Sequence, residues 1–218
     1  MRRALSSSAD TSFPIPDGRD HERVQRGQGL VEFAALVPVF LLLLLGMLEF
    51  GFVFDQNLTL EYATREGARA GSALANDGAT CDAATTTVDA QILAAVRRVL
   101  FSPGSRVKPA MGMAVLIWKA DVNGAPAGSQ TTNTWTYTGP GTGPVVDSQA
   151  IGFTEGAHPW NACSRSNSGT NPDSIGVSLT YTYAFQTPLA GILRFFGGGS
   201  AGTLAISDKT VMALNPTK

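Results

Sequence analysis

A long apolar run near the N-terminus constrains this chain more than any other feature. Residues 33–54 contain a single charged side chain, Glu49, and include the unbroken apolar stretch Val39–Leu45. As a helix, such a run is about 33 Å long, enough to cross a hydrocarbon core of roughly 30 Å. Pro38 is tolerable because neighbouring groups in a membrane helix can satisfy the freed carbonyl. We therefore expect a transmembrane helix over residues 28–54, with Glu49 near its outer end, solvated among the headgroups rather than bound to a partner.

A cleaved secretory signal peptide is the main alternative to a retained anchor. Its apolar region is typically about 7–15 residues long and ends at a small-residue cleavage site. The run here is longer, and the segment after it, "EFGFVFDQNLTLEYATREGARAG", contains no clear A-x-A site. The pattern favours a helix that stays in the membrane.

Basic residues before the apolar run predict its orientation. Arg19, Arg23 and Arg26 precede it closely, whereas the first arginine beyond it is Arg65. The positive-inside rule then places residues 1–27 in the cytoplasm and the rest of the chain outside it. The leader is polar and lacks periodicity, so we expect it to be disordered.

Composition and motifs exclude several classes of function. The chain has 218 residues and a formal net charge of -1, which suits one modest domain plus an anchor and supplies no basic stripe for nucleic acid. His158 lies near Cys163, but no motif supports a Cys/His nucleophile, or a metal site made by these two residues with Cys81. No Walker loop, GxSxG or HExxH sequence is present. We predict no enzyme activity, no cofactor and no metal.

The start of the apolar run carries a motif. Glu32 alone could be an acidic residue of the first helical turn, favoured by the helix dipole. However, "RGQGLVEFAALVPVFLLLLLGMLEFG" resembles the N-terminus of the TadE-like family, pilin-like proteins of the tight-adherence (Tad) pilus system. Prepilins of that system carry Gly-x-x-x-x-Glu-Phe/Tyr, present here as Gly27 to Glu32-Phe33. The resemblance implies cleavage between Gly27 and Gln28 by a membrane-embedded prepilin peptidase.

The spacing of this motif suits that chemistry. Gly27 has no side chain to clash when an extended backbone enters a protease cleft. After cleavage Gln28 would bear a free amine, and Glu32 would lie one helical turn away on the same face. The carboxylate could then pair with this amine or with that of a neighbouring subunit.

The helix is expected to continue beyond the membrane over residues 55–76. Small residues recur every fourth position at Ala63, Gly67, Gly71 and Ala75, a ridge on which another backbone can pack closely. It could pack against the protein's own sheet or against another subunit. The segment "YATREGARAG" is also similar to the TadE-like family.

Residues 77–218 are predicted to form an extracytoplasmic α+β domain. We expect a second helix in "ATTTVDAQILAAVRRVLFSPG" and strands in "MGMAVLIWKADVNG", "TNTWTYTG", "SIGVSLTYTYAFQTP" and "AGTLAISDKTVMAL". Residues 139–174 are rich in Gly, Pro, Ser, Asn and Thr and indicate a long surface loop. The fold class is thus a pilin-like α+β protein: a long N-terminal transmembrane helix continuing outward, a second helix and a small antiparallel sheet.

Two features of this domain leave alternatives open. "PLAGILRFFGGG" indicates a compact apolar turn whose Phe195-Phe196 pair caps the core or lies at the membrane interface. Cys81 and Cys163 share a compartment and lack a CxxC partner; in an oxidising compartment they would form a disulfide, and otherwise two buried thiols.

Together these features predict a structural assembly protein, a minor pilin or pseudopilin of a Tad pilus or secretion apparatus. Its expected partners are the membrane, prepilin peptidase, other pilin-like subunits and Tad assembly proteins. It would be a single-pass membrane protein that could enter the pilus. The alternative is a membrane-anchored extracytoplasmic binding module, with loop 139–174 as its recognition surface and no link to a pilus.

Overall fold

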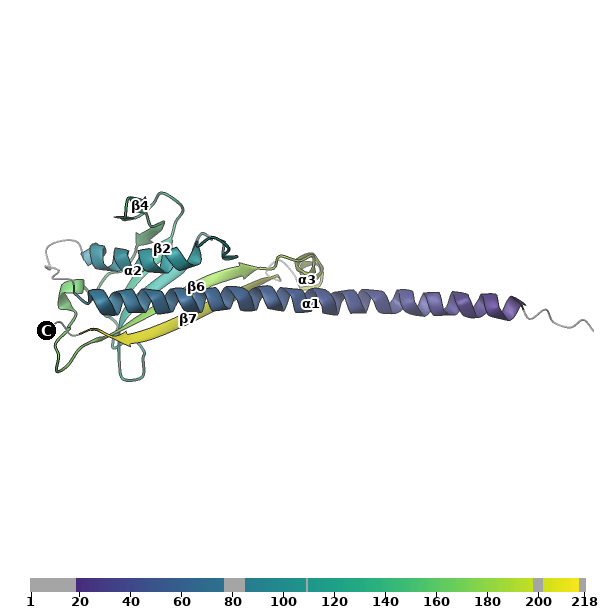
Figure 1. Ribbon diagram of the computed structural model, residues 1–218, viewed down its shortest axis with the longest axis horizontal. Coiled ribbons are helices and arrows are strands. Elements are labelled where there is room, and N and C mark those ends of the chain that lie inside the picture. Colours follow the sequence, from purple (N-terminus) through teal and green to yellow (C-terminus); the bar gives the residue numbers. More distant parts are fainter. Residues whose placement is uncertain (1–18, 77–84, 109, 198–201, 216–218) are drawn as a thin grey trace, which may run out of the picture. The chain divides into compact units, whose positions relative to one another are not determined.

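The computed structural model describes residues 19–76, 85–108, 110–197 and 202–215 (Figure 1). The chain divides into two units, one ending at Leu44 and the other beginning at Leu45.

The first element, α1 (Arg19–Leu74), is one long helix. It is long and apolar enough to cross a membrane, as expected for residues 28–54. The helix then continues to Leu74, within the segment 55–76 that was expected to extend it. It also begins earlier than predicted, because residues 19–27 of the expected disordered leader are helical. Extending an existing helix fixes one residue for each hydrogen bond gained, which is far easier than starting a new helix.

The second unit is built on a five-stranded antiparallel sheet with strand order β5-β2-β1-β6-β7. The strands of this sheet are β1 (Ala114–Ala120), β2 (Thr132–Tyr137), β5 (Phe153–Glu155), β6 (Ser174–Ala184) and β7 (Thr203–Ala213). The predicted second helix is α2 (Thr85–Leu100). The α+β fold class is therefore confirmed.

The pairing of β6 with β7 is the longest in the sheet and runs from Ser174↔Ala213 to Ala184↔Thr203. Alternate side chains of β6, from Ile175 to Tyr183, are buried, as the alternation of apolar and polar residues predicted.

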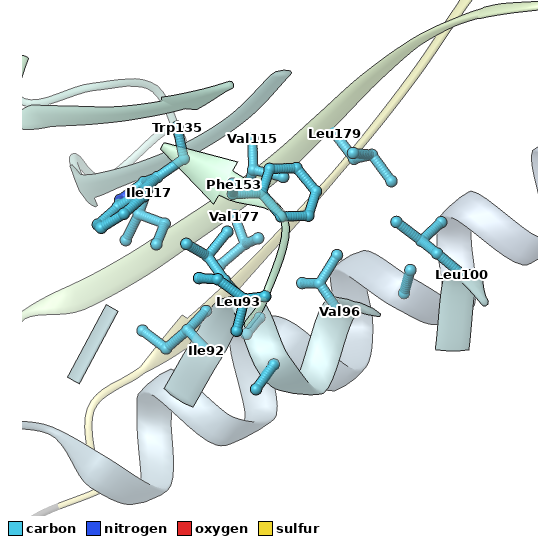
Figure 2. Close-up of a cluster of buried hydrophobic side chains, with 14 of the residues drawn as sticks. Ile92, Leu93, Val96, Leu100, Val115, Ile117, Trp135, Phe153, Val177 and Leu179 are labelled. Atoms are coloured by element: carbon cyan, nitrogen blue, oxygen red, sulfur yellow. The ribbon is translucent and has the colours of Figure 1, made fainter. Parts of the chain in front are cut away.

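The core lies between the sheet and α2, with the C-terminal half of α1 beside α2 (Figures 1 and 2). Figure 2 shows the apolar face of α2 directed at side chains of the sheet. The labelled core residues are Ile92, Leu93, Val96 and Leu100 from α2, and Val115, Ile117, Trp135, Phe153, Val177 and Leu179 from the sheet.

The prediction of a surface loop over residues 139–174 is wrong for much of that segment. It contains β3 (Val145–Val146), β4 (Gln149–Ala150), β5 and the short 3-10 helix η1 (Ala162–Ser164). Phe153, Trp160 and Arg165 are buried within it. Burial of one large apolar side chain contributes about 1.5–3 kcal/mol. The apolar residues therefore hold the segment on the core, and its glycines serve the turns.

The apolar segment between β6 and β7 also differs from expectation. It forms the helix α3 (Leu189–Gly197), where a compact turn was predicted. Of the two positions expected for Phe195, the cap on the core is wrong. Its side chain is 84% exposed, because α3 lies beyond the ends of the strands it connects (Figure 1). The side chain of Phe196 lies outside the described part of the chain.

Candidate functional site

The predicted processing motif lies on an exposed part of α1 in the first unit. Gly27, Gln28, Glu32 and Phe33 are all exposed. The side-chain amide of Gln28 donates a hydrogen bond to Oε1 of Glu32 over 3.1 Å. The one-turn spacing between these residues thus brings the acid next to the residue that would carry the new amine.

The bond between Gly27 and Gln28 lies inside α1, in helical conformation. A protease cleft takes an extended backbone, so cleavage at this bond would require this part of α1 to unwind. Gly27 and Gly29 each disfavour a helix by roughly 1 kcal/mol relative to alanine. A Cβ built on either glycine meets no atom within 4 Å, so no side-chain packing opposes unwinding there.

The ridge of small residues is buried in the second unit. Ala63, Gly67, Gly71 and Ala75 are all inaccessible to solvent or nearly so. A Cβ on Gly67 would approach Val96 of α2 to 2.6 Å. A Cβ on Gly71 would approach Ile175 of β6 to 2.7 Å. The ridge thus packs on the same chain, and its surface is not exposed to a second subunit.

Glu49 occupies a site that sequence reasoning missed. It is only 3% exposed, so the expectation of a solvated side chain among headgroups is wrong. Its Oε1 accepts hydrogen bonds from the hydroxyl of Tyr183 and from the backbone N–H of Gln186, the latter over 2.9 Å. Its Oε2 accepts one from the backbone N–H of Thr187 over 3.0 Å. We call these four residues the Glu49 socket.

The socket fastens the turn between β6 and α3 to helix α1. Hydrogen bonds to a charged acceptor are roughly twice as strong as those between neutral groups. Burial raises the pKa of the Tyr183 hydroxyl, and its hydrogen bond to Glu49 raises that pKa further. The phenol therefore stays protonated and remains a donor. No local pattern could have revealed the socket, since 134 residues separate Glu49 from Tyr183.

A second buried polar cluster joins α2, β2 and the segment after β5. Asp89 of α2 accepts hydrogen bonds from Arg165, over 2.5 Å, and from Asn133 of β2, over 2.8 Å. Asn133 also exchanges two hydrogen bonds with the backbone of Trp160, each 2.8 Å long. The guanidinium of Arg165 lies 4.6 Å from the Trp160 ring. These contacts hold the segment around Trp160 against the core.

His158 borders this cluster instead of forming a Cys/His pair. Its Nδ1 lies 2.5 Å from Oε1 of Glu155, and its Nε2 lies 3.8 Å from Oδ2 of Asp89. Among the described residues, no group of three or more His, Cys, Asp or Glu side chains could hold a metal ion.

Of the two cysteines, only Cys163 is described. It lies in η1 and is disulfide-bonded. Cys81 lies outside the described residues, so the pairing of Cys81 with Cys163 stays a prediction.

The fold is α+β and is built on one long helix that is apolar enough to cross a membrane once. Residues 27–69 match the family model of the TadE-like proteins, which confirms the resemblance drawn from the motif. No curated protein and no solved structure matches the chain. The TadE-like family is a structural family associated with the Tad pilus, and the match indicates a protein of that kind. The matched range contains the processing motif, Glu49, and the first two residues of the ridge.

Proposed function

We propose that this protein is a pilin-like subunit, a minor pilin or pseudopilin, of a Tad pilus or secretion apparatus. The observation that carries the proposal is the family match, which begins at Gly27, the residue before the expected cleavage point. Exposed side chains at Gln28, Glu32 and Phe33 support it, because a recognition motif has to be accessible to the peptidase.

Prepilin peptidase cuts between Gly27 and Gln28 in this proposal. Cleavage places a positive charge on the backbone nitrogen of Gln28, at the N-terminus of the shortened helix. The helix dipole disfavours a cation there. The Glu32 carboxylate, already within hydrogen-bonding distance of the Gln28 side chain, offsets that charge in the same subunit or in the next one.

The second unit supplies the subunit's extracytoplasmic body. Its small-residue ridge is filled by α2 and β6, and the Glu49 socket fixes the turn before α3 to α1. Contacts with other subunits would therefore use the exposed apolar surface of α1, which includes Leu36, Phe40 and Leu43.

Mass spectrometry of the protein's N-terminus tests the proposal. In cells with an active prepilin peptidase, we expect a mature chain that begins at Gln28. Gly27→Val should block cleavage, because a branched side chain at the cut clashes in the protease cleft. Gly29→Ala is the matched control, a glycine substitution in the same helix two residues away, and should still be processed.

An intact Met1 on the chain from such cells would contradict the pilin-like assignment. Equal processing of the Gly27→Val variant and the control would show that the peptidase does not use Gly27.

A further inference from the structure

Helix α3 is too short to cross a membrane and yet is almost wholly apolar. It has nine residues and is thus about 13 Å long, against roughly 30 Å of hydrocarbon. Ile192, Leu193 and Phe195 are exposed on it. Short apolar helices are usually buried in a core or lie at an interface, and the exposure of these side chains rules out the core.

The Glu49 socket fixes the position of α3 along the axis of α1. Gln186 and Thr187, whose N–H groups bind Glu49, are separated from the first residue of the helix by Pro188 alone. The hydroxyl of Thr187 accepts a hydrogen bond from the N–H of Leu189 over 3.3 Å, as an N-cap does, and Pro188 suits the first turn. The start of α3 is therefore held beside Glu49, at the outer end of the apolar run.

The surface around this point in the second unit is also apolar. Leu48, Phe50 and Phe54 of α1 are exposed, as is Leu204 at the start of β7. A groove of about 420 Å³ lies between α1 and β7, and its lining includes the apolar residues Phe50, Phe54 and Leu204 and the polar residues Asn57 and Ser207. A Cβ on Gly202, just before β7, would lie 3.3 Å from Ala190 of α3. Helix α3 and this groove thus belong to one end of the domain.

We propose that α3 lies in the headgroup region of the bilayer that α1 crosses, with its apolar side chains inserted at the acyl boundary. Interfacial helices sink about 5–10 Å into that boundary. Arg194 is the one charged residue of α3, and a guanidinium suits lipid phosphate. The exposed apolar surface of α1 at Leu48 and Phe50 is continuous with the run that enters the bilayer, which favours lipid over a second copy of the chain.

The socket makes this placement compatible with an acid at residue 49. A carboxylate facing lipid would be costly. Here Tyr183 and the two backbone N–H groups surround it, so the surface that meets the bilayer is apolar. The proposal rests on α1 spanning the membrane and does not depend on cleavage after Gly27.

Depth measurement with a fluorescent label tests this placement. We would attach an environment-sensitive nitrobenzoxadiazole label to a Phe195→Cys variant of the full chain in phosphatidylcholine vesicles. Val122→Cys, at a fully exposed position between β1 and β2, is the matched control, and the unsubstituted chain gives the background labelling. A phosphatidylcholine bearing a nitroxide near its carbonyls serves as the quencher.

We expect the label at residue 195 to emit at shorter wavelength than the control and to lose most of its emission to the nitroxide lipid. It should also resist quenching by aqueous iodide. The label at residue 122 should show the reverse.

Two results would overturn the proposal. Iodide quenching of both labels without nitroxide quenching would place α3 in water. Protection from both quenchers at residue 195, increasing with the protein-to-lipid ratio, would show that a second copy covers the face. Neither result bears on cleavage after Gly27, because N-terminal mass spectrometry measures that cleavage separately.

Discussion

The carboxylate of Glu49 connects two parts of the chain that are 134 residues apart. Replacing it by alanine leaves three donors unsatisfied in a buried site. Each such donor costs about 1–3 kcal/mol. We expect Glu49→Ala to lower the free energy of unfolding of the second unit by about 3 kcal/mol or more. Glu49→Gln, which keeps one acceptor oxygen, should cause a smaller loss. Urea denaturation in detergent, followed by the fluorescence of the three buried tryptophans, measures both.

Glu61→Ala supplies the control for that comparison. It removes a carboxylate from the same helix, where Glu61 pairs with the exposed Arg65. Exposed ion pairs contribute about 0.2–1 kcal/mol, so this change should be small. A loss from Glu49→Ala no larger than that of the control would show that the socket contributes little to stability.

The packing of α1 on α2 and β6 depends on the absence of side chains at two glycines. In Gly67→Ala the new methyl would lie 2.6 Å from a methyl of Val96, and valine in a helix has one strongly preferred rotamer. Overpacking of this kind costs about 1–3 kcal/mol and outweighs the roughly 1 kcal/mol gained in helix propensity. We expect net destabilisation, measured by the same urea titration.

Gly51→Ala is the matched control, because the same substitution in the same helix meets no atom within 4 Å. It should leave the unfolding curve unchanged or shift it to slightly higher urea. The Gly67→Ala/Val96→Ala double variant should be more stable than the sum of the two single losses predicts, because removing the Val96 methyls relieves the clash. A double variant that is no more stable than this sum predicts would show that the methyl of Gly67→Ala does not clash with Val96.

The elements that sequence patterns predicted correctly are those with a long, regular period. The alternation in β6 and the helical periodicity of α2 each extend over three or more repeats, and the apolar run of α1 is longer still. By contrast, β3, β4 and β5 span two or three residues each. Strands this short show no alternation of apolar and polar residues, so the glycines and prolines of the segment predict a loop instead.

The candidate sites differ in a similar respect, because one can be found from a local pattern and two cannot. The motif from Gly27 to Phe33 is local and could be found from spacing alone. The socket and the cluster around Asp89 and Arg165 are non-local, because each joins side chains from separate elements. The one local signal for the socket is a charged residue within an apolar run. Two of its three donors are backbone N–H groups, which no residue type reveals, and the third, the Tyr183 hydroxyl, is 134 residues away.

At the scale of the whole molecule, one covalent link would close a loop of the second unit. Because Cys163 is disulfide-bonded and the chain has two cysteines, we predict the bond Cys81–Cys163. A cross-link over a loop of this length stabilises a fold by about 4.5 kcal/mol in the chain-entropy model. Reduction, or the Cys81→Ser/Cys163→Ser double variant, should therefore lower the midpoint of urea denaturation. Ready labelling of both cysteines by a thiol reagent before any reduction would contradict the pairing.

The place of β6 in the sheet also determines when the core of the second unit can close during synthesis. The ribosome makes α1, α2, β1 and β2 before β6, yet β6 pairs with β1 and β7, covers Gly71, and carries Tyr183 of the socket. Contacts between such distant segments form late and slowly. The anchor can therefore enter the bilayer while the rest of the nascent chain is still unfolded. A chain that ends before β6 lacks the strand that joins β1 to β7 and the Tyr183 donor of the socket, so it cannot close its core.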